Sequence, residues 1–358
     1  MRRDIDEYAE QDFARAVLDE AQYIKNPFTQ VARAAKRLPA GVRFALTGTP
    51  IENRLSELWS IFDFLMPGLL GTRESFAKRF ESPVEHAEGD SAARLQALVS
   101  PFVLRRVKED VVADLPEKIE DTVMAQLTGE QRKLYLANQD RIAQQVQHRE
   151  SSEFKKDKLK VLAELTKLRQ ICCDPRLHYE DYKAGSAKLD TCMELVHGAH
   201  DGGHRILLFS QFTGMLDIIG KRLAKEDIVF LKLTGASSKE SRAKMVAQFQ
   251  AGEVPVFLIS LKAGGVGLNL TAADVVIHYD PWWNVAAQDQ ATDRAHRIGQ
   301  QHTVTVYKLI AKDTIEERIM QMQESKRDLV NSVLGGDGIS SALFTREDVL
   351  ALLGGDGR

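Results

Sequence analysis

The sequence predicts an α/β fold with two parallel sheets and a helical section between them, and three observations indicate this. Two apolar stretches near the start, residues 16–18 and 44–46, run directly into polar loops, as buried parallel strands do at their carboxyl ends. Residues from Leu55 to about Lys183 carry long helical periodicity. From Ser186 onward, apolar strands and helical patterns alternate again, which is typical of a doubly wound parallel sheet.

The individual elements follow from local patterns. In residues 158–172, leucine or isoleucine recurs every third residue among charged side chains, which predicts a long helix. Residues 144–158 carry many charges, and either a solvated helix or a mobile connection fits them. Residues 182–186 are a candidate linker, and a last helix is expected from Asp313 to about Leu334, before a glycine-rich end. The strands expected in the second sheet are Arg205–Phe209, Val229–Leu233, Val254–Ile259, Asp274–Tyr279 and Thr303–Ile310.

Composition limits the number of domains and the class of protein, but it does not reveal the function. The 358 residues are enough for two or three domains, and 44% hydrophobic with 28% charged residues is typical of globular proteins. The net charge of −3 gives no argument for nucleic-acid binding, so any such surface must be a local basic patch. No apolar stretch approaches membrane-spanning length and no secretory signal opens the chain, so we expect an intracellular protein with no membrane partner. The three cysteines, Cys172, Cys173 and Cys192, have neither zinc-site nor disulfide spacing and are expected to be reduced structural thiols.

Polar side chains follow both of the first two strands. Asp19 and Glu20 come directly after the first strand, where a P-loop nucleotidase places the acid that holds Mg²⁺ and the acid that polarises water. An acidic pair alone after a strand is common and better fits an ordinary solvated loop or helix cap. Thr47-Gly48-Thr49-Pro50 follows the second strand and supplies hydroxyls and a tight turn, which could couple a nucleotide site to a neighbouring surface; by itself it is only a turn. In α/β sheets, ligands bind at this edge of the sheet.

Two segments near the end of the chain could bind phosphate. Arg294 and Arg297 lie three residues apart, which places them on one face of a predicted helix within residues 288–300. Two such guanidinium groups suit a transferring phosphoryl group, although surface salt bridges would use the same residues. Residues 260–269 form a glycine-rich turn after a buried strand, where backbone amides could approach a phosphate, or where the chain merely turns tightly.

Six segments, taken together and in order, resemble the Swi/Snf-type DNA translocases of helicase superfamily two. The likeness covers about residues 13 to 325, and the Arg-Ala-His-Arg-Ile-Gly-Gln ending is highly specific to that family. The ending is compact and carries no histone-reading domain, so the chain looks more like the bacterial members of that family. Further agreement comes from Ile51-Glu52-Asn53, Leu104-Arg105-Arg106, Asp114-Leu115-Pro116 and Leu168-Arg169-Gln170-Ile171-Cys172. The six segments are Asp19-Glu20-Ala21-Gln22, Thr47-Gly48-Thr49-Pro50, Phe209-Ser210-Gln211-Phe212, residues 264–269, Asp280-Pro281-Trp282-Trp283-Asn284 and Asp293-Arg294-Ala295-His296-Arg297-Ile298-Gly299-Gln300.

The resemblance implies an ATP-dependent motor on double-stranded DNA with two RecA-like lobes and ATP between them. Asp19 and Glu20 would hold Mg²⁺ and activate water, and Arg294 and Arg297 would act as arginine fingers when the lobes close. Trp282 and Trp283 would brace the second lobe. Residues expected to bind ATP or couple its hydrolysis are Gln22, Thr47, Gly48, Thr49, Gly265, Gly267, Gln290 and Asp293, and residues expected near the DNA or the lobe interface are Gln211, Lys262, Ala263 and Gly264.

The resemblance also implies four regions. Residues 1–125 would be the C-terminal remainder of the first lobe with a helical protrusion, and 126–185 a helical insertion with linker. Residues 186–330 would be the complete second lobe and 331–358 a tail. Binding to duplex DNA should be directed mainly at the backbone, with a DNA-bound protein or RNA polymerase as the remodelling target. Such a protein would work in the cytoplasm, on the nucleoid in a bacterium.

The main departure from the family pattern lies upstream of the acidic pair. Only 18 residues precede Asp19, and the sequence contains no Gly-x-x-x-x-Gly-Lys-Thr/Ser phosphate loop. Without that loop, the phosphates of ATP lose their amide cradle and lysine, so this chain alone is expected to be inactive, as a truncated motor. The loss should also leave apolar faces of the first sheet exposed. Two alternatives stay open, a non-catalytic module that binds nucleic acid or a partner, and a true unwinding helicase.

Overall fold

The computed structural model divides the chain into two compact units. The first contains Met1–Arg105, Trp283–Ala286 and Gln323–Leu343, and the second contains Arg106–Trp282, Ala287–Met322 and Phe344–Arg358. The structure describes residues 2–48, 55–82, 91–104, 106, 115–147, 151–264, 267–282, 285–323 and 346–354.

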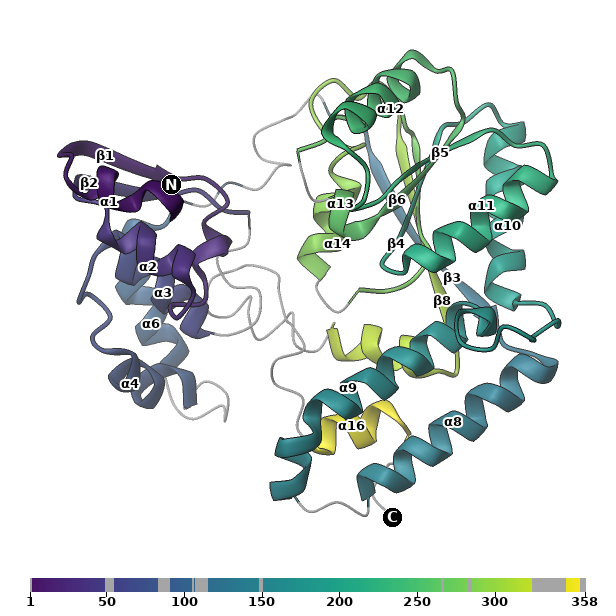
Figure 1. The fold of residues 1–358 in the computed structure, drawn as a ribbon, viewed down its shortest axis with the longest axis horizontal. Coiled ribbons are helices and arrows are strands. Elements are labelled where there is room, and N and C mark those ends of the chain that lie inside the picture. The colour runs from purple at the N-terminus through teal and green to yellow at the C-terminus, as the bar shows by residue number, and fades with distance from the viewer. Residues whose placement is uncertain are drawn as a thin grey trace. The chain divides into compact units, whose positions relative to one another are not determined.

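The first unit contains a two-stranded parallel sheet with helices on one side of it (Figure 1). One face of β1 (Phe13–Leu18) and β2 (Ala40–Ala45) carries Ala16, Leu18 and Ala45, which pack against α2 (Gln30–Arg37) and α3 (Leu55–Leu65). The Thr29 hydroxyl accepts a hydrogen bond from the Ala32 amide and so caps the start of α2. The other elements of this unit are η1 (Arg2–Asp4), α1 (Ile5–Ala9), η2 (Ala21–Ile24), α4 (Arg73–Phe76), the π-helix η3 (Ala77–Glu81), α6 (Ser91–Val99) and η4 (Ser100–Phe102).

The opposite face of this small sheet is apolar and exposed. Val17 is 57% exposed and Phe44 48%, and they are neighbours across the strand pair. Phe13 and Val42 extend the same exposed face. The sequence predicted such exposed apolar faces, and the side-chain exposures agree with that expectation. Isolated exposed apolar residues are ordinary, but a contiguous set on one sheet face marks a surface that another segment can cover.

The second unit is built on a parallel six-stranded sheet with the order β3-β8-β7-β4-β6-β5 (Figure 1). The five strands that the sequence predicts are present within one or two residues of the expected bounds. The sequence missed β3 (Lys118–Gln126), which pairs with β8 along its whole length. The expected division at residue 125 is therefore wrong, because β3 belongs to the second sheet. The strands are β4 (Ile206–Ser210), β5 (Phe230–Leu233), β6 (Val256–Ser260), β7 (Val275–His278) and β8 (Val304–Lys312).

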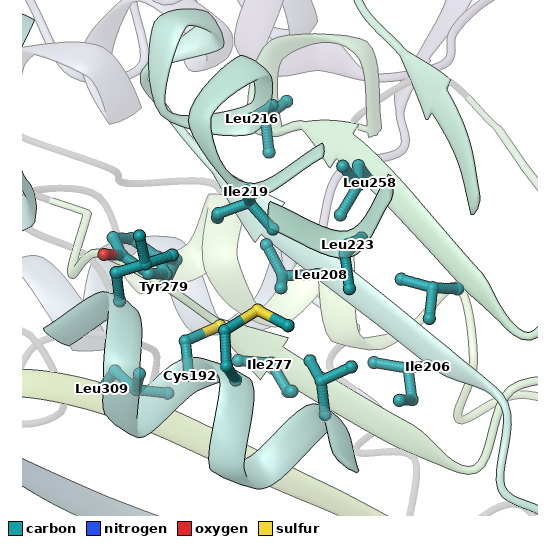
Figure 2. Close-up of a cluster of buried hydrophobic side chains, with 14 of the residues drawn as sticks. Cys192, Ile206, Leu208, Leu216, Ile219, Leu223, Leu258, Ile277, Tyr279 and Leu309 are labelled. Carbon is teal, nitrogen blue, oxygen red and sulfur yellow. The ribbon is translucent and has the colours of Figure 1, made fainter. Parts of the chain in front are cut away.

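Helices cover both faces of this sheet because successive side chains of each strand point to opposite sides. Ile206 and Leu208 of β4 face α10 (Ala187–Asp201) and α11 (Thr213–Lys225), as Figure 2 shows for Leu208, Ile219 and Leu223. Their neighbours Leu207 and Phe209 lie in the other core, with Phe249 of α12 (Lys239–Ala251). That core also holds Ala291 of α14 (Val285–Thr292), so the sheet directly supports the segment that carries the arginines.

The helical insertion expected at residues 126–185 belongs to the second unit. α8 (Gly129–Gln147) and α9 (Ser151–Cys173) lie side by side, and the buried Cys173 at the end of α9 packs into the core beneath α10 and α11 (Figure 1). The predicted tail is partly folded, since α16 (Arg346–Leu352) packs on α8. The Gln139 side chain of α8 donates a hydrogen bond to the Leu353 carbonyl at 2.6 Å. Residues 331–345 of the expected tail, and the predicted helix beyond residue 323, lie outside the described residues.

A buried ion pair fixes α10 to the helical residues 315–323 that follow β8. The Lys188 ammonium and the Glu316 carboxylate are both 0% exposed and lie 2.5 Å apart. Burial by itself would lower the pKa of Lys188, but the Glu316 carboxylate outweighs it and the pKa is raised. The Ala311 amide and the Cys173 thiol also donate to Glu316. Such additional hydrogen bonds make a buried charge pair tolerable.

The three cysteines are free and buried, as the sequence predicted for structural thiols. Burial raises the pKa of Cys172 and Cys173, and that of Cys192 to about 12. Thiols held protonated in this way are poor nucleophiles and poor metal ligands. Between η5 (Pro175–Leu177) and α10, the expected linker is an ordered connection, in which Ser186 caps α10 and donates to the Cys173 carbonyl.

Candidate functional site

In the first unit, the predicted acidic pair and the threonine turn meet at the carboxyl ends of β1 and β2. The two strands are parallel and in register, with Leu18 opposite Ala45, so the loops that follow them are neighbours. The Leu46 amide donates to the Leu18 carbonyl at 2.8 Å, and the Ala21 amide donates to the Leu46 carbonyl at 2.9 Å. The sequence placed a site at this edge of the sheet, and the backbone brings its loops together there.

A side-chain relay connects these two loops. The Thr47 hydroxyl donates to the Gln22 side-chain oxygen at 2.8 Å, and the Gln22 side-chain nitrogen donates to the Glu20 carboxylate at 2.7 Å. Glu20 has φ 52°, a left-handed conformation that few residues other than glycine adopt. The Asp19 carboxylate accepts from the Glu20 amide at 2.9 Å, which stabilises that turn. Gln22 therefore couples the orientation of Glu20 to the position of Thr47.

The acidic pair fits the way proteins bind Mg²⁺ with a nucleotide. Asp19 and Glu20 are exposed at the sheet edge, where their carboxylates can reach a ligand. Across the described ranges, no cluster of three or more His, Cys, Asp or Glu side chains is arranged to hold a metal ion. Mg²⁺ does not require such a cluster, because it commonly keeps several waters and binds one or two carboxylates together with substrate phosphates. Gly48 is exposed in the same turn, and Thr49 lies outside the described residues.

In the second unit, the arginine segment is not helical as expected. The helix α14 ends at Thr292, and residues 293–299 form successive turns. The prediction that Arg294 and Arg297 share one face of a helix was therefore wrong. The physical reason is that the segment is bound to its neighbours: the Arg294 carbonyl accepts a hydrogen bond from the Leu270 amide at 2.9 Å. Gln290 lies on α14, and Asp293 is exposed in the first turn after it.

Gln300 fixes the far end of the arginine segment, a role that sequence reasoning did not assign. Its side-chain nitrogen lies within hydrogen-bond distance of three carbonyl oxygens, those of Thr271, Ala273 and Ala295. Its side-chain oxygen accepts from the amides of Gln301 and His302. Because the side chain is buried, water does not compete for these hydrogen bonds, and they fix the local backbone conformation. The glutamine that ends the motif is therefore structural.

The arginine segment also meets the glycine-rich turn. The Arg297 guanidinium donates to the Leu268 carbonyl, at 3.4 Å, directly after Gly267. Gly267 has φ 47°, a conformation that glycine adopts without strain. The structure thus brings together Arg297 and Gly267, two residues expected to act on the nucleotide. Gly265 lies outside the described residues.

Gln211, expected near the DNA, bonds within the protein. Its side-chain nitrogen donates to the Asp280 carboxylate at 2.6 Å, and its side-chain oxygen accepts from the Arg169 guanidinium at 3.1 Å. Arg169 of α9 also donates to the Pro281 carbonyl, and the Ser210 hydroxyl donates to Asp280. Arg169 and Asp280 are almost completely buried, so this network fixes α9 to the loops after β4 and β7. Arg169 and Asp280 both lie in segments that carry the family resemblance, but the sequence predicted no role for either residue.

The other expected DNA-binding residues lie at the end of β6. Ala263 of α13 (Leu261–Gly264) is buried in the core beneath the arginine segment, so only its backbone could contact a ligand. The side chain of Lys262 lies outside the described residues, and Gly264 is the last described residue before the gap. Trp282 packs against the same core, as a residue bracing this unit would, and Trp283 lies outside the described residues.

His278 links the end of β7 to α14. The ring is buried, stacks on Phe209 with the ring centroids 5.5 Å apart, and its Nε2 lies 2.8 Å from the Thr292 hydroxyl. Burial, together with the nearby Lys308 ammonium, lowers the pKa of His278 to about 3. The ring is therefore neutral near pH 7 and acts as a packing and hydrogen-bonding group at the start of the arginine segment.

Comparisons with known proteins identify the family that the chain resembles. Residues 1–177 match the model of the SNF2-related domain, and residues 187–299 match the helicase conserved C-terminal domain. An uncharacterized ATP-dependent helicase of Mycoplasma pneumoniae is 41% identical over 98% of this chain and 34% of its own length. The putative ATP-dependent helicase/translocase YwqA of Bacillus subtilis is 42% identical over 92% of this chain and 36% of its own length. The chain thus spans about a third of the length of these relatives.

A solved structure is similar as well. The SWI2/SNF2 ATPase core of Sulfolobus solfataricus in complex with double-stranded DNA is 38% identical to the chain, with a TM-score of 0.53. The similarity covers 92% of this chain and 70% of that one.

Proposed function

Because the chain belongs to the SWI2/SNF2 family, whose ATPase core has the RecA-like α/β fold, we propose that it forms part of an ATP-driven motor that moves along double-stranded DNA. The observation that carries the proposal is the pair of preorganised loops. One loop holds Glu20 through Gln22 and Thr47, and the other holds Arg297 beside Gly267. ATP hydrolysis needs both a group that activates water and a group that stabilises charge on the γ-phosphoryl group.

The proposed roles follow from the chemistry of each residue. Asp19 and Glu20 would hold Mg²⁺, which would neutralise phosphate charge when bound. Glu20 would polarise the attacking water. Because Gln22 bonds to both Glu20 and Thr47, a change in the position of Thr47 would change the orientation of Glu20. Arg294 and Arg297 would stabilise negative charge on the same ATP molecule, which a planar guanidinium does better than a compact ammonium group. Gly48, Gln290 and Asp293 would line the nucleotide.

Double-stranded DNA is the proposed track, contacted mainly through its backbone. A relative of known structure was solved as a complex with double-stranded DNA. Contacts to the DNA backbone position a protein without reading the base sequence. Strand separation is not part of the proposal. A DNA-bound protein or RNA polymerase is the proposed target of remodelling, in the cytoplasm or on the nucleoid. Among the described helices, none is long and apolar enough to cross a membrane.

A non-catalytic binding module is the second candidate, and one observation favours it for these residues alone. The sequence contains no glycine-lysine phosphate loop. We therefore define an extended protein as residues 1–358 preceded by an upstream segment that supplies a glycine-lysine phosphate loop. The exposed apolar face of β1 and β2 is the surface on which such a segment would pack.

Residues 1–358 alone are expected to show no ATP hydrolysis above background at millimolar ATP, with or without duplex DNA, because nothing cradles the β- and γ-phosphates. The extended protein is expected to hydrolyse ATP and to do so faster with duplex DNA. The measurement is phosphate release against time for both proteins. Robust turnover by residues 1–358 would contradict the inactivity, and an inert, folded extended protein that still binds DNA would favour the binding module.

A further inference from the structure

His296 lies between the two arginines and contacts the segment that leads into the second unit. The Nε2 atom of His296 lies 2.8 Å from the Pro116 carbonyl oxygen. A carbonyl can only accept, so Nε2 carries the proton and donates. The ring is buried, with 8% exposure, so water competes little for this bond.

The connecting segment, residues 115–118, leads into β3 within the second unit. The first unit includes the chain up to Arg105, and the first described residues beyond 106 are Leu115 and Pro116. The Glu117 carbonyl accepts from the Val304 amide at 3.0 Å, and Lys118 then begins the pairing of β3 with β8. The covalent link from the first unit therefore reaches the second sheet beside the arginine segment.

An irregular turn depends on such side-chain bonds more than a helix would. Residues 293–299 lie beyond the end of α14 and lack a continuous helical ladder of hydrogen bonds. Gln300 fixes the end of the turn, and His296 fixes its middle. A small shift of His296 changes the backbone that carries Arg294 on one side and Arg297 on the other. Misplacement of a catalytic group by about 1 Å can cost roughly 10²-fold in rate.

Electrostatics place the same two segments against each other. Burial by itself would lower the pKa of Lys118, but Glu120 and then Asp289 and Asp293 raise it, so two carboxylates just before Arg294 act on the start of β3. Lys118 also forms a 2.7 Å ion pair with Glu120. The contact through His296 therefore belongs to a broader junction between β3 and the arginine segment.

We propose that His296 is a positioning residue, which ties the connecting segment to the arginine turn and so sets Arg294 and Arg297 for phosphate contact. The proposal rests on the proposed function for its kinetic consequence. The tie between the connecting segment and the arginine turn through His296 does not depend on the proposed function.

The first experiment tests the bond in residues 1–358 as they are. Hydrogen exchange is measured for peptides covering 115–126 and 293–302 in the parent, in His296→Phe and in His296→Gln. Phenylalanine keeps the ring but cannot donate, whereas a glutamine side-chain nitrogen reaches about as far as Nε2. We expect exchange about 2- to 10-fold faster in both peptides of His296→Phe, the factor that one lost hydrogen bond gives, and near-parent exchange in His296→Gln.

The second experiment measures, by ATPase kinetics of the extended protein, whether His296 affects the action of Arg294 and Arg297. His296→Phe is expected to lower kcat for ATP about 10- to 100-fold with KM for ATP and duplex-DNA affinity unchanged, and His296→Gln is expected to restore most of the loss. His200→Phe, the same change at an exposed site on α10, is the control and should behave as the parent.

Each outcome decides the inference. Unchanged exchange in both peptides of His296→Phe would show that the bond holds neither segment, and the proposal would fall. Faster exchange with a parent-like kcat, or failure of glutamine to restore kcat, would show a merely structural contact. If the extended parent protein hydrolyses no ATP, the proposed function fails, while the exchange result still decides whether His296 ties the two segments together.

Discussion

Arg297→Ala in the extended protein is expected to lower ATP turnover by about 10³- to 10⁵-fold, or about 4 to 7 kcal/mol of barrier, while ATP binding changes little. The reason is that an arginine finger acts on charge that appears only in the transition state. In the structure the Arg297 guanidinium donates to the Leu268 carbonyl at 3.4 Å, a neutral partner and not a carboxylate. A surface salt bridge would contribute only about 0 to 1 kcal/mol, so the two roles differ by a margin that kinetics can resolve.

The measurement is turnover at saturating ATP and duplex DNA, with thermal unfolding as the control for folding. Arg297→Lys is expected to rescue little, because lysine keeps the charge and loses the planar fork of donors. Arg242→Ala on α12 removes a guanidinium elsewhere in the same unit and should turn over as the parent does. If Arg297→Ala stays within about threefold of the parent, less than about 1 kcal/mol, the finger assignment is wrong.

Glu20→Gln in the extended protein is expected to abolish measurable hydrolysis, a loss of at least about 10²- to 10⁴-fold, while ATP still binds. An amide keeps the shape of the carboxylate but cannot polarise water as a base. The local structure should survive, because the new amide oxygen can accept from the Gln22 side chain as the carboxylate does at 2.7 Å. The local structure is therefore expected to be preserved while the proposed chemistry is removed.

Two assays separate binding from chemistry for this variant: titration with a fluorescent ATP analogue, and phosphate release at saturating ATP and duplex DNA. Glu10→Gln, the same substitution at the end of α1, is the matched control and should match the parent in both. Normal hydrolysis by Glu20→Gln would show that another group activates water. Lost ATP binding would show that Glu20 holds the nucleotide instead.

The second sheet could be predicted well from sequence because its strands are buried on both faces. Val275–His278 and Val256–Ser260 are fully buried and read as short continuous apolar runs between turn signals. The meeting of the acidic loop with the threonine turn was also predictable, since parallel strands bring their carboxyl ends to one edge. The relay through Gln22 specifically required side-chain positions, although the sequence had marked Gln22 and Thr47 as coupled to the nucleotide.

What the sequence missed depends on tertiary contacts. β3 reads Lys-Ile-Glu-Asp-Thr-Val-Met-Ala-Gln, and of these only Ala125 is buried, so an edge strand of this kind has no clear apolar alternation. The spacing of Arg294 and Arg297 fits a helix, but bonds to Leu270 and through Gln300 end the helix at Thr292. Arg169 lies in a motif that the sequence shows, but its burial could not be predicted because its hydrogen-bond partners lie in loops far away in the sequence.

Displacement of a third strand from a DNA triplex by the extended protein tests the central claim most directly, because a motor that moves along duplex DNA removes the third strand without separating the duplex. The account predicts ATP-dependent displacement that Glu20→Gln abolishes, with the two duplex strands remaining paired. Vigorous DNA-stimulated hydrolysis without displacement, or separation of the duplex strands, would contradict it.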